Sequence, residues 1–239
     1  MEKEEIRQEI WTLLEERKVA RFPLPIVGRI PNFEGASEAA RQLEGLDSWQ
    51  DTKALKSNPD SPQRWARRLA LSQGKTIYMA VPRLTQMDCF LELNPSVIGK
   101  PERASTIKGA FALGRPVSPE RVRPVDLVLA GSVAVNHKGG RVGKGGGYSD
   151  IEYAIGRECG FLQEGTPVVT TVHPLQLIRG EIPMLVHDIP VDAVATPKAI
   201  HKMTPRYSKP DGIHWELLSE GKLHQIPILQ EMRGHAKLE

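Results

Sequence analysis

The sequence predicts an α/β fold of three layers, in which helices cover both faces of a largely parallel central sheet. Short apolar runs alternate with amphipathic segments along most of the chain, so that strands and helices follow one another. At 239 residues, 40% hydrophobic and 26% charged, the chain has an ordinary globular composition and is long enough for one sizeable core. We therefore expect one main domain.

The N-terminal segment predicts a helix over about residues 3–19, because four apolar residues repeat at helical spacing: Ile6, Ile10, Leu13 and Leu14. Residues 22–35 contain three prolines and two glycines, which predict an ordered connector. A second helix, rich in alanine, is expected over about 36–45.

The middle of the chain predicts most of the sheet. The expected strands lie within 46–55 and at 76–81, 126–134, 167–172 and 193–196, and the expected helices at 62–72 and 151–159. A glycine-rich stretch follows strand 126–134. It would therefore lie at the carboxyl end of a strand, where ligands collect in open α/β sheets.

The last forty residues differ in character from the rest. Residues 207–211 are expected to form a loop, and 215–218 with 226–229 a short helix or strand. We assign residues 1–200 to an α/β domain and 201–239 to a C-terminal extension packed on the same domain. A subunit contact is the alternative for this extension, and the sequence leaves monomer and dimer open.

Charge favours small anionic ligands at least as much as nucleic acid, since the net charge is only +3 and the pI is about 8.8. The helix expected at 62–72 carries Arg64, Arg67 and Arg68 on a local basic face. A solvated helix face is the favoured interpretation, and RNA binding is the least favoured function.

Cys89 and Cys159 lie far apart and do not form a ligand cluster. No apolar run approaches the ~20 residues of a membrane helix, and the charged N-terminus is not followed by the apolar core of a signal peptide. We therefore expect a reduced, cytoplasmic protein without a membrane partner.

The stretch 139–150 sets Arg141 and Lys144 among six glycines, which is the composition of a phosphate cradle. Asp150 at its end could hold magnesium against the same phosphates. A P-loop is excluded because Gly145 follows Lys144, and a dinucleotide fingerprint is excluded because its third glycine would fall on Tyr148. A flexible hairpin with solvated charges is the alternative.

Four segments together carry a family resemblance. They are Lys3-Glu4-Glu5-Ile6-Arg7, the strand Gly-Lys-Thr-Ile-Tyr-Met-Ala-Val-Pro-Arg at 74–83, Arg141-Val142-Gly143-Lys144-Gly145-Gly146-Gly147-Tyr148-Ser149-Asp150, and Val186-His187-Asp188-Ile189-Pro190-Val191-Asp192. In order and position they resemble the 5-formyltetrahydrofolate cyclo-ligase family, over most of residues 1–200. The resemblance implies a cyclo-ligase-like α/β fold.

The resemblance also implies a reaction. Such enzymes use ATP and magnesium to phosphorylate the formyl oxygen of 5-formyltetrahydrofolate, which then cyclises to 5,10-methenyltetrahydrofolate. Catalysis of phosphoryl transfer is mainly positioning and charge stabilisation, and the implied catalytic residues are Arg141 and Lys144. The implied ATP-binding residues are Lys3, Arg7, Arg141, Gly143, Lys144, Gly145, Gly146, Gly147, Tyr148 and Asp150. Asp150 and Asp188 would hold the metal, and Tyr148 would lie against the pterin.

Two positions depart from the family. Ser149 stands where the family has a second tyrosine that contacts folate, and the acidic residue that grips folate after the family's first strand has no clear counterpart. Asp60 could replace that residue or could cap the next helix. The predicted function is therefore a cyclo-ligase or close relative, and the alternative is a non-catalytic or differently specific protein that binds a nucleotide or heterocycle.

Two histidines lie near the predicted site. We exclude His187 as a magnesium ligand, because magnesium selects oxygen. His173 ends a predicted strand, and a structural hydrogen bond is expected there.

Overall fold

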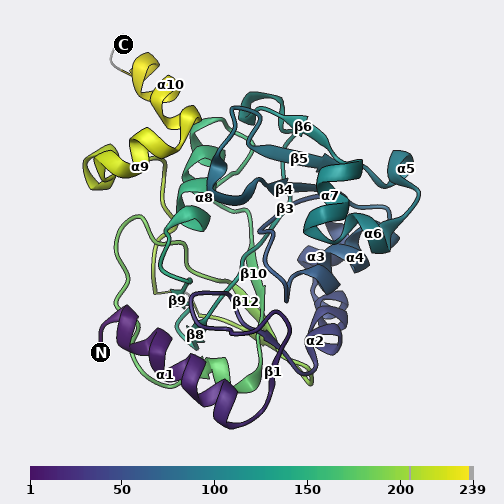
Figure 1. Ribbon diagram of the computed structural model, residues 1–239, viewed down its shortest axis with the longest axis vertical. Coiled ribbons are helices and arrows are strands. Elements are labelled where there is room, and N and C mark those ends of the chain that lie inside the picture. The colour runs from purple at the N-terminus through teal and green to yellow at the C-terminus, as the bar shows by residue number, and fades with distance from the viewer. Residues whose placement is uncertain (205, 237–239) are drawn as a thin grey trace.

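The computed structural model describes residues 1–204 and 206–236, and a sheet of eight strands runs through its centre (Figure 1). The strand order is β13-β12-β10-β7-β3-β4-β5-β6. The five inner strands are parallel: β3 (Ala54–Ser57), β4 (Thr76–Ala80), β7 (Leu127–Leu129), β10 (Val168–Thr171) and β12 (Ala193–Ala195). The outer strands pair antiparallel: β5 (Phe90–Leu93), β6 (Arg115–Val117) and β13 (Ile200–Lys202).

Helices cover both faces of this sheet because successive strand residues point to opposite sides. In β7, Val128 faces one cluster of buried residues, whereas Leu127 and Leu129 face the other. The first face is covered by α8 (Tyr148–Glu158), and α9 (Glu220–Gln225) and α10 (Pro227–Ala236) extend the same apolar cluster beyond α8 (Figure 1). The second is covered mainly by α2 (Ala36–Gln42), α3 (Asp47–Asp51), α4 (Arg64–Ser72), α6 (Pro101–Ala104) and α7 (Ile107–Leu113). The predicted α/β fold with a largely parallel sheet is confirmed.

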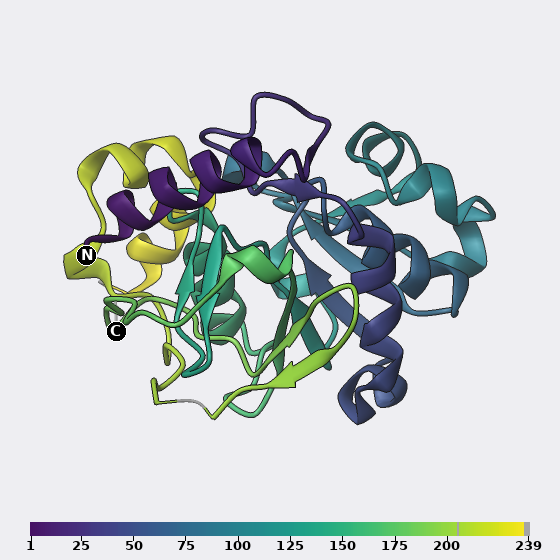
Figure 2. The ribbon, with the colours of Figure 1, turned by 90° about the horizontal axis from the view of Figure 1, so that it is seen from below.

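A smaller sheet lies beside the main one and carries the glycine-rich stretch. It consists of β11 (Leu177–Ile178), β8 (Ala134–Asn136) and β9 (Arg141–Val142), with β8 parallel to β11 and antiparallel to β9. Helix α1 (Lys3–Glu16) packs on this sheet, burying Ile6, Ile10 and Leu14 against Val133 and Val142 (Figure 2). The N-terminal helix is thereby held next to the glycine loop.

The remaining elements are short. They are β1 (Ala20–Arg21), β2 (Asn32–Phe33), α5 (Pro95–Ile98) and the 3-10 turns η1 (Leu43–Gly45), η2 (Pro82–Leu84), η3 (Pro119–Arg121), η4 (Pro174–Gln176) and η5 (Trp215–Leu217). Within the described ranges, no helix is long and apolar enough to span a membrane.

Several sequence-based boundaries are wrong. The predicted strand 126–134 is two strands in different sheets, because the chain turns away at Gly131, whose N–H donates to the Asn58 side chain. Half of 46–55 is the helix α3, which buries Trp49, and β3 begins only at Ala54. The strands β5 and β6 and the helices between them were not predicted.

Helix ends and the C-terminal segment differ in detail. Helix α1 ends at Glu16 rather than at residue 19, and α8 begins at Tyr148 rather than at residue 151. Residues 145–147 are therefore the end of the loop, and Asp150 lies in the first turn of a helix. Of the two alternatives for 215–218 and 226–229, the helix is correct.

Candidate functional site

The glycine loop links β9 to α8 and has a backbone that only glycine adopts readily. Gly145 and Gly147 have φ values of 100° and 68°. Gly147 is the N-cap of α8, whose first N–H groups have no acceptor within the helix. A Cβ on Gly146 would lie 2.9 Å from the Tyr148 ring. The loop can thus present backbone N–H groups to an anion at the positive end of a helix of eleven residues.

Two cations from α1 reach this loop and the segment behind it. Arg7 donates from Nε to the carbonyl oxygen of Gly143 at 2.8 Å, and Lys3 forms an ion pair with Asp188. Lys3 and Arg7 are one helical turn apart and so lie on the same face of α1. The structure therefore brings together residues from three distant segments that the sequence predicts to share one site.

Arg141 is buried, and its guanidinium donates to three protein acceptors. It donates to the carbonyl oxygens of Gly131 at 2.9 Å and Ile189 at 3.1 Å, and to Oδ1 of Asp150 at 2.6 Å. The same Oδ1 accepts from the backbone N–H of Ile189 at 3.1 Å. Arg141 thus holds Asp150 beside Ile189, the residue that follows Asp188. A contact between Arg141 and phosphate stays a prediction.

The two carboxylates suit a magnesium ion that also binds phosphate. Oδ2 of Asp188 accepts from Lys3 and from the N–H of Leu185. Oδ2 of Asp150 and Oδ1 of Asp188 make no hydrogen bond to the residues in the described part of the chain. Magnesium usually binds through one or two carboxylates plus phosphate and water. Across those residues no cluster of three or more His, Cys, Asp or Glu side chains could form an all-protein metal site.

Lys144 extends from the loop to the end of β3, where Nζ lies 2.7 Å from Oδ1 of Asp60. Its side chain is 40% exposed, so it can exchange this partner for another anion. Asp60 does not cap the next helix, because Gln63 is the N-cap of α4 and no side chain bonds that cap. Of the two alternatives for Asp60, the structure excludes the helix cap, and a contact with folate stays a prediction.

Arg67 holds the segment that carries Asp60, and its predicted place on a solvated basic face is wrong. The side chain is buried and donates to the carbonyl oxygens of Asn58 at 2.7 Å, Asp60 at 3.1 Å and Ser105 at 3.0 Å. Burial lowers the pKa of Arg67 to about 10. An RNA-binding face that uses Arg67 is excluded by the same contacts.

A buried polar network joins the end of β3 to the first turns of α8. Lys56 forms an ion pair with Glu152, which also accepts from Nδ2 of Asn58 at 2.6 Å. Oδ1 of Asn58 accepts from the N–H of Gly131 at 2.9 Å and from the hydroxyl of Ser149 at 3.1 Å. Burial raises the pKa of Glu152, and the Lys56 charge opposes that shift. Ser149, the position that departs from the family, thus ties the glycine loop to the central sheet.

Tyr148 contacts the C-terminal extension. Nζ of Lys222 lies 3.2 Å from the centre of its ring, and its hydroxyl donates to Oε1 of Gln225 at 3.3 Å. The predicted contact between Tyr148 and a pterin stays a prediction.

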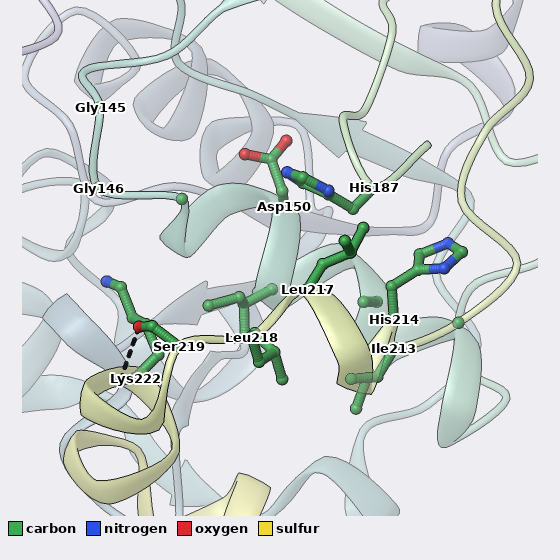
Figure 3. Close-up of a pocket in the computed structure, with 14 residues that line it drawn as sticks. Gly145, Gly146, Asp150, His187, Ile213, His214, Leu217, Leu218, Ser219 and Lys222 are labelled. Carbon is green, nitrogen blue, oxygen red and sulfur yellow. Dashed lines mark hydrogen bonds between the residues drawn. The ribbon is translucent and has the colours of Figure 1, made fainter. Parts of the chain in front are cut away.

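A pocket of about 220 Å³ lies between the glycine loop and this extension (Figure 3). One wall comprises residues 145–147 and the side of α8 with Asp150, Ile151 and Ala154. The other wall comprises residues 212–214, 217–219 and Lys222, and His187 closes one side.

His173 has the structural hydrogen bond that was expected. Its Nδ1 accepts from the N–H of Leu175 at 3.2 Å and so caps η4. Burial lowers the pKa of His173.

Several residues of the site were missed. Asn58 follows the buried strand β3, and a polar side chain at the carboxyl end of a strand could have indicated a role. Lys56 and Glu152 could be paired only after the sheet and α8 were placed. The pocket residues of the extension had no counterpart in the resemblance.

Fold and geometry together define an α/β protein in which an N-terminal helix, a glycine loop and the segment 185–189 meet around two carboxylates. The family model for the 5-formyltetrahydrofolate cyclo-ligase family matches residues 1–197. The chain belongs to this family.

The relatives agree with this assignment, and a solved structure agrees with the fold. A mouse methenyltetrahydrofolate synthase domain-containing protein is 39% identical over 98% of this chain, and its human counterpart is 37% identical over 97%. The chain spans only 64% and 61% of the length of these relatives. The NMR structure of an Aquifex aeolicus 5,10-methenyltetrahydrofolate synthetase matches 91% of this chain and all of that one, with a TM-score of 0.52 and 20% identity, and supports the fold.

Proposed function

We propose that the chain is an ATP- and magnesium-dependent 5-formyltetrahydrofolate cyclo-ligase. The observation that carries this proposal is the convergence of Lys3, Arg7, Asp150 and Asp188 around the glycine loop in a member of the family. These four residues come from three segments that lie far apart along the chain, and the packing of α1 on the smaller sheet brings Lys3 and Arg7 to the other two.

The residues have distinct roles in this proposal. Lys3, Arg7 and Lys144 bind the phosphates together with N–H groups of residues 145–147. When the nucleotide binds, Lys3 releases Asp188 and Lys144 releases Asp60. Both ammonium groups then contact phosphate oxygens. Arg141 keeps Asp150 in place and, with Lys144, offsets negative charge during transfer. A magnesium ion held by Asp150 and Asp188 would neutralise phosphate charge and help to orient the transferred group.

The reaction requires positioning and no protein nucleophile. The formyl oxygen forms a bond to the γ-phosphorus as the bond to the bridging oxygen breaks and ADP leaves. The neighbouring amine of the folate then attacks the formyl carbon, phosphate leaves with the former formyl oxygen, and the amine proton is released. The backbone N–H groups and cations of the loop stabilise the charge that moves in the first step.

The test is turnover of 5-formyltetrahydrofolate with Mg-ATP, followed by the near-ultraviolet absorbance of the methenyl product. We expect Lys144→Ala to weaken ATP binding roughly ten- to hundredfold, because a charge-assisted contact with phosphate is lost. Lys108→Ala removes an exposed lysine of α7 and should leave turnover unchanged. Binding of ATP without any turnover would contradict the proposed reaction.

A second candidate is binding of a nucleotide and a different heterocycle without this reaction. The observation that favours it is that Lys222 covers the Tyr148 ring, while Ser149 bonds Asn58 where the family has a second tyrosine. Turnover of the folate at ordinary enzyme rates would exclude this candidate.

A further inference from the structure

We propose that the C-terminal extension forms the binding pocket for the nucleotide base, so that residues outside the family match complete the ATP site. The inference rests on the proposed nucleotide site of the glycine loop. The pocket in Figure 3 opens between that loop and the extension, and its second wall consists of residues 212–222. The family model ends at residue 197, so this wall lies outside the residues that it matches.

The wall is fixed on the domain by specific contacts. The N–H of Ile213 donates to Oε1 of Glu158 at 2.8 Å, and Nζ of Lys209 lies 2.8 Å from Oδ2 of Asp192. Leu223, Ile226 and Leu229 are buried in the same cluster as α8. Both walls of the pocket are therefore held in place by contacts within the protein.

The chemistry of the pocket matches a flat heteroaromatic ring. Ile151 and Ala154 face Ile213, Leu217 and Leu218 across it, so most of the lining is apolar. Two polar atoms in the lining residues are buried without a hydrogen bond in the described structure: Nδ1 of His187, and Nε2 of His214, which lies 3.6 Å from Oδ1 of Asp211. An apolar slot with a few polar atoms at its edge is typical of sites that bind ring systems.

The position of the pocket favours the base of the nucleotide over the pterin of the folate. The pocket includes Asp150 and residues 145–147, where the phosphates and metal are proposed to bind. Lys144 and Ser149 instead contact Asp60 and Asn58 at the end of β3. The β3 side of the loop is therefore a separate position, which is left for the folate.

The experiment compares two probes by isothermal titration calorimetry: Mg-ATP and Mg-tripolyphosphate, which has the same phosphates and no base. Leu217→Ser removes a half-exposed lining side chain, and Ala154→Leu fills the pocket from α8. We expect each variant to weaken ATP binding about tenfold, the effect of a changed apolar contact in a pocket, and to leave tripolyphosphate binding unchanged. Val97→Ser, at an exposed apolar residue of α5, is the matched control and should change neither.

Each other outcome overturns the inference in a recognisable way. If the variants weaken both probes equally, or neither, the extension does not bind the base. If they weaken binding of 5-formyltetrahydrofolate while ATP binding is unchanged, the pocket belongs to the pterin and the proposed reaction stands. If the unaltered protein binds neither ATP nor tripolyphosphate, the proposed function fails as well.

Discussion

The Lys56–Glu152 pair shows how one contact between charged residues can organise a site. Both side chains are buried, and Asn58 donates to the same carboxylate oxygen as Lys56. Removing two charges from water is unfavourable, so such a pair contributes little net stability compared with apolar residues, yet losing one partner is costly. The pair therefore acts chiefly by holding Asn58, which in turn bonds Gly131 and Ser149.

At this position we predict that Glu152→Ala lowers the free energy of unfolding by roughly 3–5 kcal/mol, because Lys56 is left buried without a partner. The double change Lys56→Met with Glu152→Leu should lower it less than Glu152→Ala alone. Urea unfolding measures both. Glu38→Ala removes the exposed Arg41–Glu38 pair and should change stability by less than about 1 kcal/mol. Equal losses for Glu152→Ala and the double change would contradict this account.

Among single residues, the sequence predicted those that belong to a motif and missed those defined by contact. The motifs of the family can be read from the sequence at four of these residues: Lys3, Arg7, Asp150 and Asp188. Asn58 belongs to no such motif, because its partners lie on β7 and α8 and are brought to it only by the sheet.

At the scale of elements, helix α4 holds a neighbouring irregular segment in place, and its sequence did not indicate this role. The helix was predicted correctly, but Arg67 turns inward to bond carbonyl oxygens of the irregular segment 58–60. Helical periodicity describes only which side of a helix is apolar, so it could not reveal acceptors in a loop. Arg67 thereby positions Asp60 for its contact with Lys144.

We predict that Arg67→Ala lowers the free energy of unfolding by roughly 3 kcal/mol, since several buried carbonyl groups lose a charged donor. It should also weaken ligand binding at the Asp60 side of the loop. The matched control is Arg68→Ala, in which a half-exposed neighbour paired with Glu102 is removed, with an expected loss below about 1 kcal/mol. Chemical unfolding of the two variants gives the comparison, and equal losses would show that Arg67 has no special role.

We expect the stability of the protein to depend on pH because of His173, which caps the turn η4. Burial holds the pKa of His173 below its ordinary value of 6.5, which His173 regains on unfolding. Its stabilising contribution is complete above pH 6.5 and is lost as the pH falls through the lower, folded pKa, because the unfolded chain binds the proton first. His173→Gln should therefore reduce the loss of thermal stability between pH 7 and pH 5.

At the scale of the whole molecule, the parallel core was predictable because its strands are continuous apolar runs buried on both faces. The outer strands were not, since β5 and β6 are separated by three short helices without a strong period. The second, smaller sheet was also missed. Its strands are only two or three residues long, and β8 follows β7 so closely in sequence that the two were predicted as one.

The extension should unfold together with the domain, because Ile226 and Leu229 are buried in the same cluster as α8 and β10. Ile226→Ala should lower the free energy of unfolding by roughly 2–5 kcal/mol and keep one cooperative transition. Circular dichroism and tryptophan fluorescence should report the same midpoint. Val97→Ala is the control at an exposed apolar residue. Two separate transitions would mean that the extension is an independent unit.

The burial of the extension also affects the order in which parts of the domain can fold during synthesis. Residues 220–229 leave the ribosome after every strand of the main sheet, yet they cover the outer side of α8 in the largest apolar cluster. Until they emerge, the nascent chain exposes that surface of α8 next to the glycine loop. The same late arrival delays the proposed base pocket, so the nascent chain cannot close around a nucleotide before its C-terminal helices are made.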